Sequence, residues 1–256
     1  MRGVSKVFSN GTVALKDMSL EVERGEFLSL LGPSGCGKST ALRIIAGLGA
    51  ATSGSIEWPT SKLNSKGLPQ GDIGFVFQEP TLMPWATVFG NVYLPLKLEG
   101  VGQSEARPRV METLASVGLG DFAEAYPREL SGGMKMRVSI ARALVTRPKL
   151  LLMDEPFAAL DEITRQKLND DVLRLWRRSG VTVIFVTHSV FESAYLSNRI
   201  VVMKARPGQV YADIPLGTST DRDANYRTSE DYRATTDKVS RTLQDAIHVG
   251  GGSVGH

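Results

Sequence analysis

The segment from Gly32 to Thr40 reads Gly-Pro-Ser-Gly-Cys-Gly-Lys-Ser-Thr, and these residue types at this spacing are suited to binding phosphate. Glycine permits a close backbone approach and positive φ angles, so successive N–H groups can turn towards an anion at the start of the next helix. Lys38 supplies a mobile positive charge, and the Ser39 hydroxyl is placed to bind Mg²⁺. The residues predicted to contact the phosphates are Gly32, Pro33, Ser34, Gly35, Cys36, Gly37, Lys38, Ser39 and Thr40.

The residues around this segment predict a strand before it and a helix after it. Phe27–Leu31 reads Phe-Leu-Ser-Leu-Leu, and Ala41–Ala46 continues with a helical pattern. A phosphate-binding loop requires this setting, so we favour it over a structural turn without nucleotide. Cys36 is the only cysteine of the chain, and its simpler interpretation is a small residue that fills space inside the loop.

Further apolar segments end on residues that could bind a nucleotide. One ends at Gln78, one at Asp154 and one at His188. Segments with helical patterns separate them, which predicts an α/β fold with a parallel sheet. Because such sheets bind ligands at the carboxyl ends of their strands, we expect these side chains to meet the phosphate loop at one edge.

The residue types at this edge indicate the chemistry of a nucleoside triphosphate. Mg²⁺ bridges the β- and γ-phosphates of such a ligand, and Asp154 supplies the carboxylate expected near the ion. Glu155 is placed to orient or deprotonate the attacking water, and a capping or ion-pairing carboxylate is the alternative. His188 is expected to contact the γ-phosphate, and Gln78 to bridge metal and water. The predicted catalytic residues are Lys38, Gln78, Glu155 and His188, and the predicted metal ligands are Ser39, Gln78 and Asp154.

A second anion site is predicted at Ser131, Gly132 and Gly133, directly before another helix. The Ser131 hydroxyl, the backbone N–H groups of the two glycines and the helix dipole together favour a phosphate group. Ser131 is also a suitable N-cap for the helix. Two phosphate sites in one chain suggest that ATP lies between two chains, each of which contributes one of the sites.

Taken together, these motifs resemble the ATP-binding cassette family of transport ATPases, over roughly residues 3–214. The matching segments are Gly32–Thr40, Gln78, Leu130–Met134, Leu150–Glu155, Ala159–Asp161 and His188. The resemblance implies ATP and Mg²⁺ as cofactors, and a head-to-tail homodimer in which each phosphate loop faces Ser131–Met134 of the other subunit. It also implies that adenine stacks on Phe8 and that Asp161 helps to couple the two ATP sites.

Within the family, the chain resembles the subfamily that imports nitrate, sulfonates, taurine and similar small solutes. This closer resemblance rests on Gly-Gly-Met at Gly132–Met134 and on the run from Asp154 to Arg165. Met134 stands where glutamine is commonest in the family, so we assume no hydrogen bond from this side chain to the nucleotide. Met136 also replaces a residue that is usually polar.

The resemblance implies partners and a location as well. The partners are integral membrane permease subunits and, indirectly, an extracytoplasmic solute-binding protein, with no nucleic acid. The chain would lie peripherally on the cytoplasmic face of the cell (inner) membrane. The segment after Gln78, including Trp85, would transmit the closing and reopening of the dimer, although Trp85 could equally be a core residue. A non-transport ATPase that acts on nucleic acid or ribosomes is the stronger alternative; a GTPase or nucleotide kinase is weaker, because the chain has no Asn-Lys-x-Asp motif.

The composition is that of a globular protein. The chain has 256 residues, of which 42% are hydrophobic, and its 30 basic and 27 acidic residues give a net charge of +3. No dense basic stripe occurs, so charge does not indicate a nucleic-acid partner. The sequence has no long apolar run and no signal-peptide pattern, so we expect that the chain neither spans a membrane nor is exported by itself.

We expect residues 1–216 to form the ATPase domain. In it, residues 1–84 and 136–216 would form a catalytic core of the P-loop NTPase (RecA-like) type with an N-terminal antiparallel β subdomain. Residues 85–135 would form an inserted α-helical subdomain that ends with the second anion site. Residues 217–256 would be a polar C-terminal extension with one weak helix.

The local patterns add expectations for both ends of the chain. Alternating polar and apolar residues predict antiparallel strands on both sides of the turn Ser9–Gly11, with Phe8 either packed between strands or stacked on a purine. Ile56–Trp58 is expected to be a short strand. The C-terminal helix, marked by Tyr232, Val239, Leu243 and Ile247, should be followed by a frayed tail at Gly250–Ser253.

Overall fold

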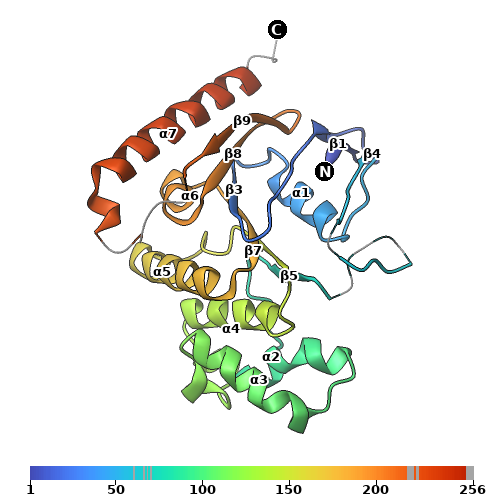
Figure 1. Cartoon of the computed structure of the whole chain (residues 1–256), viewed down its shortest axis with the longest axis vertical. Coiled ribbons are helices and arrows are strands. Elements are labelled where there is room, and N and C mark those ends of the chain that lie inside the picture. Colours follow the sequence, from blue (N-terminus) through green and yellow to red (C-terminus); the bar gives the residue numbers. More distant parts are fainter. Residues whose placement is uncertain are drawn as a thin grey trace. The chain divides into compact units, whose positions relative to one another are not determined.

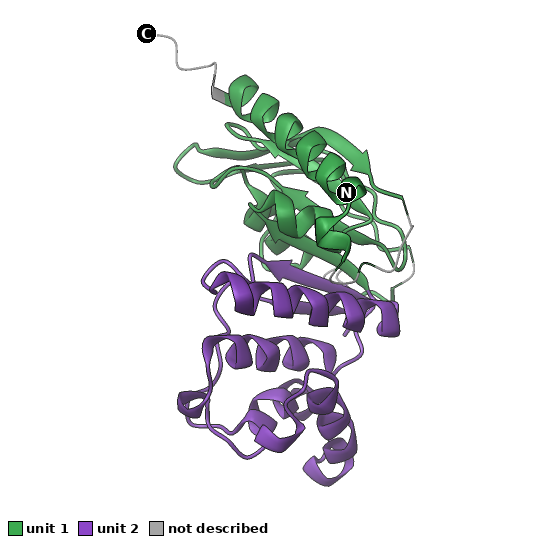
Figure 2. Ribbon diagram, turned by 90° about the vertical axis from the view of Figure 1, so that its left-hand side faces the viewer, with its two compact units in different colours: residues 1–68, 182–256 green, residues 69–181 purple. Residues whose placement is uncertain are grey.

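The computed structural model describes residues 1–59, 61–65, 67, 69, 71–217, 222 and 225–251. The chain divides into two compact units: unit 1 comprises residues 1–68 and 182–256, and unit 2 comprises residues 69–181 (Figure 2). The helical segment predicted at 85–135 falls within unit 2. The domain boundaries given above stay a prediction.

Unit 1 carries both the phosphate loop and His188 directly after strands, and Figure 1 labels these strands as β3 and β7. Its helices and strands are β1 (Arg2–Val7), β2 (Val13–Met18), β3 (Phe27–Leu31), α1 (Lys38–Ile45), β4 (Ser53–Ser55), β7 (Thr182–Thr187), α6 (Val190–Leu196), β8 (Arg199–Lys204), β9 (Gln209–Pro215), the 3-10 helix η3 (Tyr226–Thr228) and α7 (Glu230–Gly251).

Strands β7, β3, β8 and β9 lie side by side in that order. Strand β3 pairs in parallel with β7 and β8, whereas β9 returns antiparallel to β8. All residues of β3 are buried, which agrees with its continuous apolar pattern. The predicted α/β class with parallel strands is therefore observed at the phosphate loop.

The N-terminal strands form the predicted antiparallel sheet, with the order β2-β1-β4. The short strand expected at Ile56–Trp58 was placed wrongly, because β4 occupies Ser53–Ser55. Gly54 has a φ of 87°, and a Cβ atom there would lie 2.5 Å from the carbonyl oxygen of Gly3. The pairing of β4 with β1 thus depends on a close backbone approach at glycine rather than on an apolar pattern.

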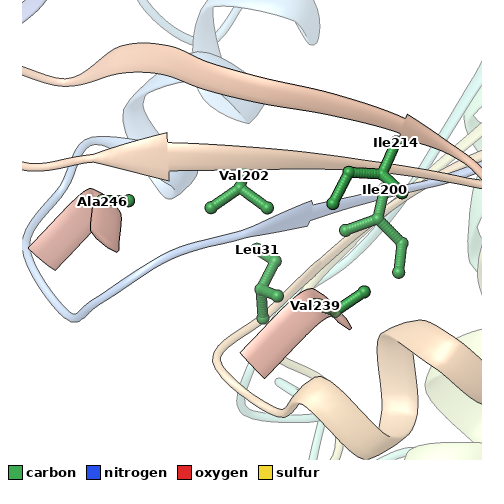
Figure 3. Packing of buried hydrophobic residues seen from close by; sticks show 6 residues of the cluster. All are labelled: Leu31, Ile200, Val202, Ile214, Val239 and Ala246. Atoms are coloured by element: carbon green, nitrogen blue, oxygen red, sulfur yellow. The ribbon is translucent and has the colours of Figure 1, made fainter. Parts of the chain in front are cut away.

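Helix α7 corrects the prediction of a weak C-terminal helix. It runs for 22 residues and packs against β8 and α6. Its side chains Val239 and Ala246 point towards the strands (Figure 3). The buried cluster that they join consists of Leu31, Ile200, Val202, Ile214, Val239 and Ala246. Gly250 belongs to the helix and not to a frayed tail, whereas Gly252 and Ser253 lie outside the described residues.

Unit 2 contains the predicted site residues Gln78, Ser131, Gly132, Gly133, Asp154, Glu155 and Asp161. Its helices and strands are β5 (Ile73–Val76), α2 (Val88–Leu98), α3 (Gln103–Ser116), η1 (Gly120–Phe122), η2 (Pro127–Glu129), α4 (Gly132–Leu144), β6 (Leu150–Asp154) and α5 (Glu162–Ser179). Strands β5 and β6 pair in parallel. Among the described residues of the whole chain, no helix is both long and apolar enough to cross a membrane.

Side-chain caps fix where the helices of unit 2 begin. The Thr87 side chain caps α2, Ser131 caps α4 by accepting from the Met134 N–H at 3.3 Å, and Asp161 caps α5. Each cap satisfies a backbone N–H that has no partner within its helix. Ser131 is thus confirmed as an N-cap, and its predicted phosphate contact stays a prediction.

Candidate functional site

The phosphate loop joins buried strand β3 to helix α1. Gly35 and Gly37 have φ angles of 76° and 94°, a region that glycine adopts without strain. A Cβ atom at Gly37 would lie 2.7 Å from the carbonyl oxygen of Ala14, and one at Gly32 would lie 2.8 Å from that of Met203. Gly37 is therefore required by both its backbone conformation and close packing, Gly35 by its conformation and Gly32 by close packing.

Lys38 begins helix α1 and is only 4% exposed. Its Nζ atom donates to the carbonyl oxygens of Gly32 at 2.8 Å and of Pro33 at 3.0 Å, so the ammonium lies against the loop itself. Burying a charge in this way is costly unless it has partners, and an anion in the loop would be one. Cys36 is buried within the same loop, consistent with the space-filling interpretation.

His188 follows β7, and the phosphate loop follows β3, at the same edge of the parallel strand pair. Leu31 and Thr187 are register partners in the parallel pair, and each is the last residue of its strand. Unit 1 therefore brings together two of the predicted site elements. Thr187 Oγ1 accepts a hydrogen bond from the Ser189 N–H at 2.9 Å, and it donates one to the buried Glu192 carboxylate.

Phe8 lies just beyond β1 and is 45% exposed, so it is not packed as a core residue between strands. Lys6 Nζ lies 5.5 Å from the centre of the Phe8 ring, and it also donates to the carbonyl oxygen of Ala50 at 2.7 Å. A cation over an aromatic ring is attracted by the charge distribution of the ring. The predicted stacking of adenine on Phe8 remains a prediction.

Gln78 follows β5, and Asp154 is the last residue of β6, with Glu155 directly after it. Val76 of β5 and Met153 of β6 are register partners, so the residues after them leave this strand pair at the same edge. Glu155 has a φ of 45°, which is strained for a residue with a side chain. Such strain occurs often at functional positions, and here it marks the carboxylate predicted to act on water.

The start of α4 packs against the start of α5. A Cβ atom at Gly133 would lie 2.7 Å from Cγ2 of Thr164, so glycine is required by this contact. Asp161 Oδ1 accepts from the Thr164 N–H at 2.9 Å. The hydrogen bonds from the Thr164 side chain and backbone lower the pKa of the Asp161 carboxyl. Unit 2 thus brings the second anion site next to Asp161.

Arg142 is a residue that the sequence did not single out. Its guanidinium, on helix α4, donates to the carbonyl oxygens of Pro80 and Thr81, both at 2.9 Å, and to Thr81 Oγ1 at 3.0 Å. Thr81 has a positive φ of 47°, and burial lowers the pKa of Arg142. Arg142 therefore holds the segment directly after Gln78. The only signal in the sequence was an arginine between two alanines.

A glycine-rich loop between a buried parallel strand and a helix that begins with a buried lysine defines a P-loop nucleotide-binding protein. Comparison with known proteins identifies the family. The family model for the ABC transporter matches residues 15–158 of the chain.

Relatives and solved structures agree with this match. The aliphatic sulfonates import ATP-binding protein of Bacillus subtilis is 44% identical over 225 residues, or 88% of this chain and 85% of that protein. The nitrate import ATP-binding protein of Synechocystis is 44% identical over 211 residues, 82% of this chain and 78% of that protein. The dimeric post-hydrolysis structure of the ATP-binding cassette MJ0796 bound to ADP and Pi has a TM-score of 0.73 and 35% identity, covering 85% of this chain and 98% of that one.

The chain belongs to the ABC transporter family. It has the P-loop NTPase fold of ABC cassettes, and it is an ATP-binding and ATP-hydrolysing member of the family. The family and the fold class predicted from the sequence are both confirmed. The roles of the individual site residues stay predictions.

Proposed function

We propose that this chain hydrolyses ATP to drive the import of a small solute of the sulfonate or nitrate type through separate permease subunits. The names of the relatives that are import ATP-binding proteins support this proposal. The structural observation that carries it is the pairing of Leu31 with Thr187, because it places the phosphate loop and His188 on adjacent strand ends. A nucleotide in the loop would then have His188 within reach of its γ-phosphate.

In this proposal, the predicted site residues act on the same ATP molecule. The loop N–H groups and Lys38 bind the phosphates, and Phe8 stacks on the adenine. Ser39, Gln78 and Asp154 offer the hydroxyl, amide and carboxylate oxygens that Mg²⁺ prefers, and the ion would neutralise charge on the β- and γ-phosphates. We therefore assign Mg²⁺ as the second cofactor.

Glu155 would orient and deprotonate the water that attacks the γ-phosphate. Its position directly after β6 and its strained φ of 45° support a role that requires one fixed side-chain direction. Gln78 would bridge the metal and this water. His188 would bind the γ-phosphate and respond to its loss, so the strand end after β7 distinguishes ATP from ADP.

We further propose a head-to-tail homodimer in which Ser131, Gly132 and Gly133 of one copy bind the γ-phosphate held by the other copy. The dimeric solved cassettes support this arrangement. Asp161, which packs beside this site, would help to couple the two ATP sites.

To test the proposed homodimer, the Ser131→Arg variant is compared with the parent chain in phosphate release and in nucleotide binding to each chain. We expect release to fall by about 100-fold while binding persists, because loss of a transition-state donor has an effect of this size. Full activity would contradict the shared site.

The permease contact would involve the segment after Gln78, where Trp85 is 77% exposed and is therefore not the core residue of the alternative prediction. An exposed tryptophan is typical of an interaction surface. The chain would then lie peripherally on the cytoplasmic face of the membrane, with the solute-binding protein on the opposite side.

Co-purification tests the transport role directly. The tagged chain should recover integral membrane subunits from detergent extracts, and Trp85→Ala should weaken this recovery without changing ATP binding. Recovery of nucleic acid or ribosomes in place of permease subunits would contradict import and would support the non-transport alternative.

A further inference from the structure

We propose that the C-terminal extension of the chain positions His188 through helix α6, and that it thereby sets the rate of ATP hydrolysis. The positioning residues are Arg222, Arg227 and Tyr232, which we call the C-terminal clamp. This inference rests on the proposed role of His188 at the γ-phosphate. All the contacts that carry it lie within unit 1.

The first step links His188 to α6. His188 lies between Thr187 and Ser189, and Thr187 Oγ1 accepts from the Ser189 N–H at 2.9 Å. The same hydroxyl donates to the carboxylate of Glu192, a buried residue in the first turn of α6. Ser189 also caps α6 by accepting from the Glu192 N–H at 3.3 Å. The backbone on both sides of His188 is therefore tied to α6, and it must follow any movement of that helix.

The second step concerns α6 itself, which has only seven residues. A helix of this length is not stable alone, so its position depends on contacts with other elements. The carbonyl groups at its C-terminal end also lack N–H donors within the helix, so they need hydrogen-bond donors from outside it. Arg222, in the C-terminal extension, supplies one such donor to the Tyr195 carbonyl oxygen.

The clamp residues make the contacts that α6 requires. Arg222 is 8% exposed; its Nη1 atom donates to the Tyr195 carbonyl oxygen at 2.9 Å, and the Tyr195 hydroxyl donates back to the Arg222 carbonyl oxygen at 3.2 Å. The Tyr232 hydroxyl donates to the carbonyl oxygen of Phe191 at 3.1 Å. The Arg227 guanidinium carbon lies 3.7 Å from the centre of the Tyr195 ring. Both ends of α6 are thus held by residues that follow β9.

Helix α7 anchors the clamp to the strand of the phosphate loop. Val239 and Ala246 of α7 pack in one cluster with Leu31, the residue directly before Gly32 (Figure 3). Val190, the first residue of α6, packs against the same cluster. One docked helix therefore contacts both strand β3, which leads into the phosphate loop, and helix α6, which follows His188.

The test compares Arg222→Met and Tyr232→Phe with the parent full-length chain. We measure the kcat of ATP hydrolysis, the Kd for ATP and the NMR signals of the His188 ring, which are assigned with His188→Ala in a chain of three histidines. Arg222→Met should lower kcat by about tenfold and leave the Kd for ATP within about twofold, because a positioning contact is lost and no phosphate ligand is removed. The His188 signals should shift or broaden. Tyr232→Phe keeps the ring and should show the same changes to a smaller extent.

Ile214→Val is the matched control. Ile214 belongs to the same core cluster as Val239 and Ala246, but it lies on strand β9 and is not a clamp residue. This substitution should lower thermal stability while kcat and the His188 signals stay at parent values. Equal kcat losses in Arg222→Met and Ile214→Val, or unchanged His188 signals in the clamp variants, would overturn the proposal. If Arg222→Met does not fold, Tyr232→Phe decides alone. If His188→Ala hydrolyses ATP at the parent rate, the proposed role of His188 at the γ-phosphate is wrong. This result is distinct from the outcomes that would overturn the clamp proposal.

Discussion

Leu31 and Thr187 are register partners at the ends of the parallel strands β3 and β7, and the phosphate loop and His188 follow them directly. Adjacent strands lie about 4.8 Å apart, so these two segments begin as near neighbours. The side chains at this edge come from residues 150 or more positions apart in the sequence, and strand pairing alone brings them together.

Gly133 is predicted to be intolerant of even a methyl group. A Cβ atom there would lie 2.7 Å from Cγ2 of Thr164, so Gly133→Ala should lower the free energy of unfolding by about 1 kcal/mol and reduce ATP hydrolysis severalfold. Without the clash, alanine would stabilise the helix relative to glycine. Thr164→Ser removes the clashing methyl, so the double variant Gly133→Ala/Thr164→Ser should regain stability and activity. Additive losses in the double variant would show that this contact is not the cause.

Arg142 should stabilise the segment after Gln78. Arg142→Met removes hydrogen bonds from a charged donor to Pro80 and Thr81, so we expect the free energy of unfolding, measured with urea, to fall by about 2 kcal/mol. Arg147→Met is the control, because Arg147 pairs with Glu112 at 3.4 Å while both side chains are largely exposed. Its loss should be under about 0.5 kcal/mol. Equal effects of the two substitutions would contradict the structural role of Arg142.

Asp161 should make stability depend on pH on the acid side. Its folded-state pKa lies below the ordinary value of 3.8, so its contribution is present above that pH and is lost as the pH falls through the folded-state pKa. Asp161→Asn keeps the helix cap but cannot ionise. The Tm advantage of the parent chain over Asp161→Asn should therefore shrink as the pH is lowered below about 4. Asp161→Ala should have a lower Tm at every pH. A constant difference between the parent and Asp161→Asn across this range would contradict the assigned pKa direction.

Local sequence patterns predicted the phosphate loop, the parallel strands around it and the cap at Ser131. These features depend on few neighbouring residues: glycine at positive φ, continuous apolar runs and side chains that accept from the first helical turn. The strand at Ser53–Ser55 was missed because its pairing depends on Gly54 approaching Gly3, which no apolar pattern reveals.

The contacts that support the site could not be predicted from the sequence either. Arg142 lies about sixty residues from its partners Pro80 and Thr81, and Arg222 lies 27 residues from Tyr195. Helix α7 was underestimated because its polar residues are numerous, although Val239 and Ala246 are buried in the core cluster and Leu243 packs against it. Such contacts join residues that are distant in the sequence, so no local pattern around either partner indicates them.

The most direct test of the central claim, that Glu155 drives hydrolysis of ATP bound at the phosphate loop, is phosphate release by Glu155→Gln at saturating MgATP. The amide keeps the size of the side chain but cannot accept the proton of the attacking water. We predict that release falls by about 10²- to 10⁴-fold while the Kd for ATP is unchanged. Release at the rate of the parent chain would contradict the account, since the strained carboxylate after β6 would then have no part in the reaction.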